Sequence, residues 1–171
     1  EGAVLLGSQD PSDYPTVPTR VEGKCRDFVA ALVNAEGCDG FTVVGPGTVG
    51  GNGYLAWRRA IALHERVPTA VNLDERRARL LYVAHSKDVR IENLRLQNPQ
   101  FWTQHFWGCE NVRLLGVTVY SPRGPEGHVK SCTDALDLDE KMTNIVASCI
   151  QTTENLGTGF SEEKTVDVGR V

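Results

Sequence analysis

An all-β solenoid, in which short strands stack coil upon coil, is the fold class that this sequence predicts. Three observations support it: two segments repeat at an offset of 23 residues, apolar residues alternate within each, and weaker copies extend the pattern in both directions. Repeats of this size are typical of solenoids, in which each repeat buries its apolar face against its neighbours. A two-sheet sandwich could hold similar strands, but a fixed period near 23 residues argues against it.

The two clear copies are residues 88–96 and 111–119. Apolar residues occupy alternate positions in each copy, which predicts strands with one buried face. Asn93 and Gly116 interrupt the alternation at matching positions. Both residue types tolerate positive φ, so we expect a tight bend at each. One copy therefore corresponds to two short strands joined by a bend.

Weaker copies flank the clear pair. Residues 40–45 precede the first clear copy by two periods, and residues 144–150 follow the second after a longer loop at 121–131. The residues that enter the first three copies, at 38–40, 86–88 and 109–111, also correspond. We expect these positions to stack over one another in the solenoid.

Two segments do not fit the repeat. Residues 22–36 could form a helix, but a capping turn followed by a strand at 31–34 is the favoured interpretation. Residues 54–79 are rich in Arg and Glu, and we expect a loop excursion with one helical turn. Because the open end of a solenoid exposes apolar strands, the first residues of the chain are expected to cover one end.

Composition limits the possible functions. The chain has 171 residues, 40% hydrophobic and 23% charged, which suits a single domain over 1–171. A formal net charge of −4 gives no basic field for nucleic acid, and no apolar run is long enough to cross a membrane. The opening Glu1-Gly-Ala-Val lacks the features of a secretory signal. The five Cys are odd in number, so at least one thiol is free or pairs with another chain. Because the sequence shows no CxxC, no accompanying His cluster and no calcium or nucleotide motif, we expect neither a metal nor a cofactor.

Five landmarks, taken in order, resemble the polygalacturonase family of glycoside hydrolases. They are the opening 2–14; G-P-G-T-V-G-G-N-G at 45–53 followed by Trp57, with Gly50 where the family has Asp; N-P-Q-F-W-T-Q-H at 98–105; C-E-N-V at 109–112; and C-T-D-A-L-D-L-D at 132–139. Together they span about residues 2–150.

The resemblance implies a right-handed parallel β-helix of few coils, from which the C-terminal part of the family fold is missing. It also implies hydrolysis of α-1,4 bonds between galacturonic acid units of pectin, with inversion. Family likeness further suggests a secreted or periplasmic monomer that acts on an acidic polysaccharide such as pectin or polygalacturonate of the cell wall. Since the net charge is negative, local Lys and Arg side chains would have to hold such a substrate.

Carried over to this sequence, the resemblance places a catalytic acid at Asp134 and a second acid at Asp137, with Cys132 where the family has Asn. Inverting hydrolysis uses one acid to protonate the leaving oxygen and one carboxylate to activate water. On a continuous strand Asp134 would share the buried face of Leu136 and Leu138. We expect a bend at residue 135 to turn Asp134 outward. The alternative is an acidic loop edge without catalysis.

Four further residues are candidates for substrate binding. Trp102 and His105 could line the groove, although Trp102 could equally cover a coil. Thr133 adjoins Asp134, and His128 lies in the loop before it, where it is a weaker candidate for the rim. Outward-facing arginines of the repeats could meet uronate carboxylates, but a solvated face is the favoured interpretation; they are Arg90, Arg95 and Arg113.

The family's adjacent pair of Asp residues, which supplies the general acid, has no counterpart here. The family spacing from Asp134 leads to Asn155, and Glu154 is the nearby acid. Glu154 is a weak substitute, because a slip of one residue sends a side chain to the opposite face of a strand. The family's later G-H-G and R-I-K motifs are also absent.

Three functions therefore stay open: a hydrolase of partial or no activity, a non-catalytic β-helix that binds polysaccharide, and a fragment without independent activity. A pectate lyase is a poorer match, because the sequence shows no calcium-binding motif.

Overall fold

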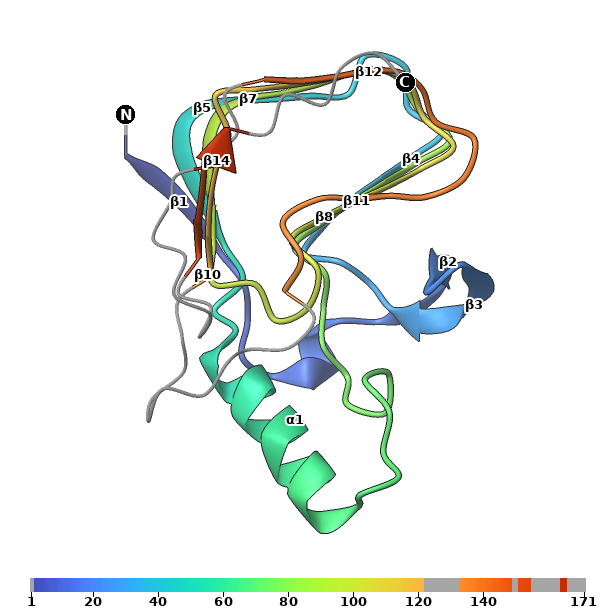
Figure 1. The fold of residues 1–171 in the computed structure, drawn as a ribbon, viewed down its shortest axis with the longest axis vertical. Coiled ribbons are helices and arrows are strands. Elements are labelled where there is room, and N and C mark those ends of the chain that lie inside the picture. The colour runs from blue at the N-terminus through green and yellow to red at the C-terminus, as the bar shows by residue number, and fades with distance from the viewer. Residues whose placement is uncertain (1, 122–132, 149–150, 155–163, 166–171) are drawn as a thin grey trace.

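A computed structural model describes residues 2–121, 133–148, 151–154 and 164–165. Figure 1 looks along stacked coils, so that strands of successive coils lie over one another. The four-stranded sheet of the coils has the order β11-β8-β6-β4, the eight-stranded sheet contains β1, β5, β7, β9, β10, β12, β13 and β14, and β2 pairs with β3. The predicted solenoid of stacked coils is confirmed.

The elements have the following bounds: β1 Ala3–Leu6, η1 Pro11–Asp13, β2 Thr16–Val21, β3 Lys24–Val29, β4 Val33–Glu36, β5 Thr42–Gly50, α1 Tyr54–Arg66, β6 Leu81–Ala84, β7 Lys87–Gln97, β8 Gln104–Trp107, β9 Glu110–Leu115, β10 Thr118–Ser121, β11 Asp137–Leu138, β12 Thr143–Ser148, β13 Gln151–Glu154 and β14 Lys164–Thr165.

The register of the parallel strands follows the sequence repeat. Arg90 of β7 pairs with Arg113 of β9, which is the predicted offset of 23 residues. Thr42 of β5 pairs with Arg90, and Ile145 of β12 pairs with Val112. These pairs reproduce the spacing of the weaker copies from the two clear ones. The sequence offset therefore gives the strand register at each step.

Both predicted bends are present. Asn93 has φ 54° and Gly116 has φ 61°, and the eight-stranded sheet turns at this level of the coil, as Figure 1 shows. A Cβ added to Gly116 would lie 2.7 Å from Oδ1 of Asn93, so the stacking of the two bends leaves no room for a side chain there. The sharp corner thus depends on residues that accept positive φ.

The apolar side chains of the coils point inward and form one continuous core. Alternate residues of β7, such as Val89, Ile91 and Leu96, are fully buried, as is Phe106 of β8. The strand-to-strand stacking of like residues explains why a plain alternation of apolar positions is enough to build this core.

A column of polar side chains lies near the start of β7, β9 and β12. Asp88, Asn111 and Asn144 occupy equivalent positions in successive coils, and all have φ between 53° and 56°. Nδ2 of Asn144 donates to Oδ1 of Asn111 at 3.0 Å, and Nδ2 of Asn111 donates to Oδ1 of Asp88 at 2.9 Å. Residues that tolerate the left-handed region are therefore also hydrogen-bonded between coils.

Replacing Asn111 by alanine is expected to lower the free energy of unfolding by about 1–2 kcal/mol. The substitution removes two exposed hydrogen bonds and leaves alanine, which has no compensating side-chain contact, in the left-handed region. Urea unfolding measures the change. Val146→Thr, on the exposed outer face of β12, is the matched control and should stay within about 0.5 kcal/mol of the parent. Equal stability of the Asn111→Ala variant and the parent would contradict the role of this column.

Residues 22–36 differ from the prediction. Neither the helix nor the capping turn is present: β2 and β3 form an antiparallel hairpin, in which Val21 pairs with Lys24. The two turn residues, Glu22 and Gly23, have φ 50° and 71°, which is the pattern of a tight two-residue hairpin turn. The strand expected at 31–34 begins later, at Val33, as β4.

Residues 54–79 also differ, because α1 is a helix of 13 residues and not a single turn. Ala56, Trp57 and Ala60 are buried on one side of it. This spacing is a short helical stripe, and two of its three residues are alanines that carry little apolar signal in a sequence. Tertiary packing therefore decides the helix. Within the described segments, this helix is too short and too polar to span a bilayer.

The N-terminal residues join the solenoid as an edge strand. β1 pairs in parallel with the second half of β5, from Gly47 to Gly50. Val4, Leu5 and Leu6 stay 50–60% exposed. The segment thus covers one edge of the eight-stranded sheet, as expected of the first residues, while its own side chains remain in solvent.

Candidate active site

The predicted site residues lie mainly on the outer face of the four-stranded sheet. Tyr82 of β6 is in register with His105 of β8, and His105 is in register with Asp137 of β11. Neighbouring strands of a sheet lie about 4.8 Å apart and residues in register share a face. The fold thereby brings Asp137 beside His105, although the two belong to separate motifs of the sequence.

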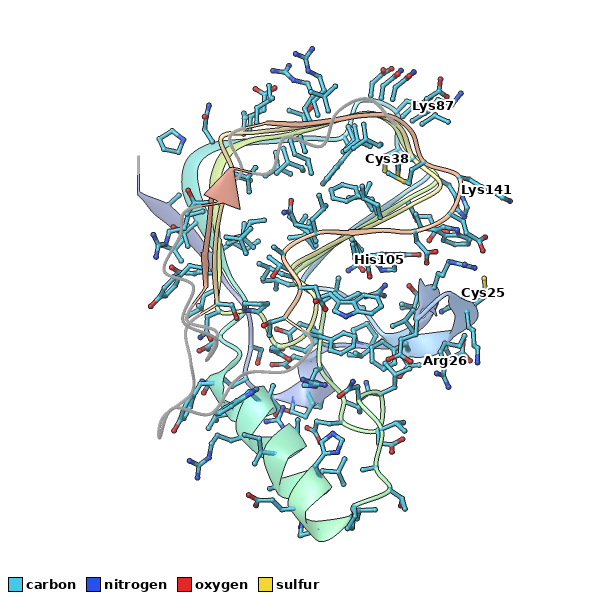
Figure 2. The ribbon with its side chains drawn as sticks, viewed as in Figure 1. Cys25, Arg26, Cys38, Lys87, His105 and Lys141 are labelled. Carbon is cyan, nitrogen blue, oxygen red and sulfur yellow. The ribbon has the colours of Figure 1, made fainter. Side chains whose placement is uncertain are left out.

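The hairpin β2–β3 lies over this outer face (Figures 1 and 2). Tyr82 is 4% exposed and His105 is 1% exposed, although both point away from the core of the coils. The amide of Arg20 in β2 donates to the Tyr82 hydroxyl at 3.4 Å. His105, which was expected to line the groove, is instead buried between the hairpin and the sheet.

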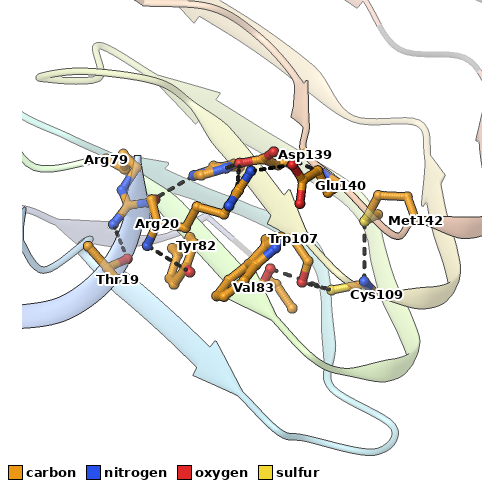
Figure 3. Close-up of polar contacts among 11 residues, drawn as sticks. Thr19, Arg20, Arg79, Tyr82, Val83, Trp107, Cys109, Asp139, Glu140 and Met142 are labelled. Atoms are coloured by element: carbon orange, nitrogen blue, oxygen red, sulfur yellow. Dashed lines mark hydrogen bonds and ion pairs between the residues drawn. The ribbon is translucent and has the colours of Figure 1, made fainter. Parts of the chain in front are cut away.

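A chain of polar contacts joins the hairpin to the sheet (Figure 3). Nη2 of Arg79 donates to Oγ1 of Thr19 at 2.8 Å, and Nη1 donates to the carbonyl of Arg20 at 2.8 Å. Nη1 also lies 2.8 Å from Nδ1 of His105. The guanidinium carbon of Arg79 lies 4.1 Å from the centre of the Tyr82 ring. Arg79 is therefore the residue at which hairpin, β6 and β8 meet.

Arg20 extends this chain of contacts to the residues that follow β11. Nε of Arg20 pairs with Oδ2 of Asp139 at 2.7 Å, and its Nη2 pairs with Oε1 of Glu140 at 2.9 Å. The Arg20 guanidinium also lies 5.4 Å from the centre of the Trp107 ring. Its pKa is raised, chiefly by the hydrogen bond to Asp139. Burial alone would raise the pKa of Asp139, but the Arg20 contacts outweigh it and lower that pKa.

Asp134 is exposed to solvent in the segment that leads into β11. The bend predicted at Ala135 is present, and Asp134 is exposed while Leu136 and Leu138 pack against the core. The backbone amide of Thr103 donates to the Asp134 carbonyl at 2.8 Å and holds the segment against the preceding coil. The carboxylate of Asp134 is thus free to meet a solute, as the predicted bend required.

Asp137 is half-buried, and its pKa is raised. Burial is the main cause, and the carboxylates of Asp139 and Asp134 add to it. The charge of Arg79 opposes this shift. Asp134 and Asp137 therefore occupy different environments, one in open solvent and one partly desolvated.

Two of the expected binding residues, Trp102 and Thr133, contact β8 or the residues just before it. Trp102 is half-buried, with its ring stacked on Phe101 at 5.0 Å and edge-on to His105 at 5.1 Å. Thr133 is half-buried, and its carbonyl accepts from Oγ1 of Thr103 at 3.5 Å. Trp102 thus packs against the cluster around Phe101 and contacts His105 of β8.

His105 is neutral under ordinary conditions. Burial and, after it, the positive charge of Arg79 lower its pKa to about 4. Nε2 of His105 lies 3.6 Å from Oδ2 of Asp139, which is too long for a hydrogen bond. Because His105 is buried, it can affect the candidate site only through the residues that it contacts.

Two candidates do not join this group in the described structure. Glu154 ends β13, in register with Ser121 of β10, and so belongs to the eight-stranded sheet. Its backbone is thus in a different sheet from that of Asp137. His128 lies outside the described residues. No cluster of His, Cys, Asp and Glu in the described part of the chain has a geometry suited to a metal ion.

The sequence interpretation missed Arg20 and Arg79, and it included Asp139 only in the alternative of an acidic loop edge. The turn Glu22-Gly23 between two alternating segments could have indicated the hairpin that carries Arg20. No local pattern distinguishes Arg79 from the neighbouring arginines, because its hydrogen-bond partners lie 26 to 60 residues away.

The sequence profile of glycosyl hydrolases family 28 matches residues 18–155. This chain belongs to that family. Curated relatives include the polygalacturonase QRT2 of Arabidopsis thaliana, 29% identical over 92 residues, which cover 51% of this chain and 19% of the relative. A polygalacturonase of Chamaecyparis obtusa is 25% identical over 133 residues, or 71% of this chain and 23% of the relative. The family 28 chain thus spans about a fifth of these relatives.

Solved structures of two hydrolases share the fold. An endo-xylogalacturonan hydrolase from Aspergillus tubingensis superposes with a TM-score of 0.66 at 20% identity, over 87% of this chain and 35% of the other. A family 28 exopolygalacturonase from Yersinia enterocolitica gives a TM-score of 0.67 at 18% identity, over 86% and 32%. The fold is a right-handed parallel β-helix, as predicted.

Proposed function

We propose that this chain is part of a polygalacturonase-type hydrolase that acts on galacturonic acid linkages in pectin. The acidic polysaccharide would lie against the four-stranded sheet at Asp134, Asp137 and Trp102. Membership of family 28 supports the reaction class, and the placement of both Asp137 and Trp102 beside His105 supports the site.

The observation that carries this proposal is the contrast between the two acids. Asp134 is exposed, whereas burial and neighbouring carboxylates raise the pKa of Asp137. Acid–base hydrolysis needs one carboxyl group that keeps its proton and one that is ionised, and different environments provide this division. Inverting hydrolysis would place a water between them, with carboxyl groups about 6.5–9.5 Å apart.

In this mechanism Asp137 protonates the leaving oxygen and Asp134 activates the water. Trp102 offers an aromatic face to a sugar ring, and Thr133 offers backbone and hydroxyl groups beside Asp134. His105 is buried, so it affects the site through its neighbour Asp137 and does not contact the substrate. Glu154 and His128 remain weaker candidates for acid and rim residue, respectively. The proposed reaction requires no cofactor.

The same proposal extends to the setting of the protein. We expect a secreted or periplasmic monomer that meets pectin of the cell wall, without nucleic acid or membrane partners. A local cation would have to offset the net charge of −4 when an anionic chain binds.

A non-catalytic binding module is the second candidate. One observation favours it: Asn155 stands where the family has its Asp pair, so an acid needed for turnover has no counterpart at that position. Retained binding of polygalacturonate without release of reducing ends would support this alternative.

The isolated chain is expected to release reducing ends from polygalacturonate very slowly or not at all, because the family's general-acid pair has no counterpart. Any turnover should vanish in Asp134→Asn, since an amide cannot activate water. A reducing-sugar assay with oligogalacturonate of defined length measures this.

Glu92→Gln, on β7 of the eight-stranded sheet, is the control and should not change the rate. Release at a normal enzymatic rate that Asp134→Asn abolishes would contradict the expected weakness and support full catalysis. Turnover unaffected by Asp134→Asn would contradict the proposed role of Asp134.

A further inference from the structure

Arg79 is a fully buried cation. It immediately precedes Leu80, ahead of β6, and is 0% exposed. Among the described residues, no carboxylate forms an ion pair with it. Burial lowers its pKa to about 10, so it is still charged at neutral pH. A buried charge without a paired counter-ion is costly, and that cost calls for a role beyond filling space.

The contacts of Arg79 determine where His105 carries its proton. A guanidinium group can only donate hydrogen bonds. Nδ1 of His105, 2.8 Å from Nη1 of Arg79, must therefore accept and be unprotonated. The single proton of the neutral ring is then on Nε2, which is buried, has no hydrogen-bond partner among the described residues and faces Asp139 at 3.6 Å. Arg79 thus selects one of the two tautomers.

Charged groups from several elements surround this pair. Arg20 of β2 and Tyr82 of β6 contact the same region, and Asp139 receives Nε of Arg20 at 2.7 Å. Asp137 is the register neighbour of His105 in β11. Two carboxylates, Asp134 and Asp139, act on Asp137 and disfavour its ionised form, whereas Arg79 favours that form.

We propose that Arg79 is a positioning residue of the candidate active site, which holds His105 in its Nε2-protonated tautomer and supplies a fixed positive charge that favours ionised Asp137. The inference rests on the proposed function for its meaning, but not for its test. Arg79 touches no substrate, because it is buried between the hairpin and the sheet. Its effect is to limit how far neighbouring carboxylates suppress the ionisation of Asp137, which keeps the proposed acid able to release its proton.

The test compares Arg79→Met, Arg79→Gln and Arg79→Lys with the parent by NMR. The ¹³C shift of the Asp137 carboxyl group is followed against pH, and the ¹⁵N shifts of the His105 ring report its tautomer. Loss of the charge in Arg79→Met or Arg79→Gln should raise the midpoint of Asp137 by about one pH unit, the lower end of the effect of a nearby opposite charge. Arg79→Lys, which keeps the charge, should restore most of the parent midpoint.

The ring shifts give a second, independent result. Arg79→Met should allow His105 to populate the Nδ1-protonated tautomer and should raise its midpoint from about 4 toward 6.5. Arg79→Gln covers the case in which the methionine variant does not fold; because it keeps a side-chain N–H donor that can still bind Nδ1, the Asp137 midpoint is the deciding result in that variant. Arg90→Met, an exposed arginine on the outer face of β7, is the matched control and should leave both residues unchanged.

A merely structural role of Arg79 makes a different prediction. It would lower the melting temperature of the neutral variants and leave the Asp137 midpoint and the His105 tautomer as in the parent. That result in either folded neutral variant would overturn the proposal. The titration needs no substrate, so a failure to bind or hydrolyse polygalacturonate would count against the proposed function alone.

Discussion

Lowering the pH from 7 to 4 is expected to reduce the free energy of unfolding by up to about 3 kcal/mol through His105 alone. Burial and the charge of Arg79 lower the pKa of this residue to about 4 in the folded protein, against an ordinary value of 6.5. Between these two values the unfolded chain binds a proton that the folded protein does not bind. Stability therefore falls as the pH falls through this window, and His105 contributes no further change below it.

Two neighbouring acids, Asp137 and Asp139, also change the free energy of unfolding with pH. The pKa of Asp137 is raised from 3.8 in the folded protein, so this group lowers stability as the pH rises through its raised value and partly offsets His105 there. The pKa of Asp139 is lowered from 3.8, so its contribution is present above that value and is lost only in more acidic solution. The difference in slope between the parent and a variant without His105 therefore reports His105 separately from these acids.

Urea unfolding at several pH values measures this dependence, with His105→Gln as the variant that cannot titrate. The slope of stability against pH should be shallower in His105→Gln than in the parent, even if the variant is less stable overall. His64→Gln, on the helix α1 and away from the network, is the control and should keep the parent slope. An identical slope in His105→Gln would show that His105 is not buried and neutral.

Replacing Phe106 by alanine is expected to lower the free energy of unfolding by about 3–5 kcal/mol. Phe106 is 0% exposed and packs inside the coils, in register with Val83 of β6 and Leu138 of β11. The loss combines the transfer of a large apolar side chain with the cavity left between three stacked coils. A domain has about 5–15 kcal/mol of stability in total, so this change should leave the protein close to unfolding.

Thermal and urea unfolding of Phe106→Ala, Phe106→Leu and Val44→Ala provide the comparison. Val44 is 54% exposed on β5, so its truncation should change stability by less than about 0.5 kcal/mol. Phe106→Leu should be intermediate, because it fills more of the cavity. A loss below about 1 kcal/mol in Phe106→Ala would contradict the continuous core of the solenoid.

The repeat could be predicted because a solenoid makes its spatial neighbours from equivalent sequence positions. The offset between 88–96 and 111–119 is also the register of β7 and β9, and Asn93 and Gly116 mark the same corner in both coils. The exposed position of Asp134 followed from one local argument, the bend at Ala135. These features depend on residues close to one another in the sequence or one period apart.

The hairpin and the charge network could not be predicted in this way. Arg20 meets Asp139 across 119 residues, and Arg79 meets Thr19 across 60, so no period or local motif connects them. The burial of His105 follows from the hairpin above it and not from the sequence around it. Long-range contacts of a segment outside the repeat therefore set the surroundings of the candidate site.

We propose that an acidic oligosaccharide binds to the outer face of the four-stranded sheet beside Asp134, Asp137 and Trp102. Titration of the ¹⁵N-labelled chain with oligogalacturonate, followed by NMR and compared with neutral dextran, tests it most directly. We predict saturable shift changes in the amides of residues 102–105 and 133–139, which weaken in Trp102→Ala. Shift changes confined to the outer face that carries Arg90 and Arg113, or no shift changes at all, would contradict binding at this site.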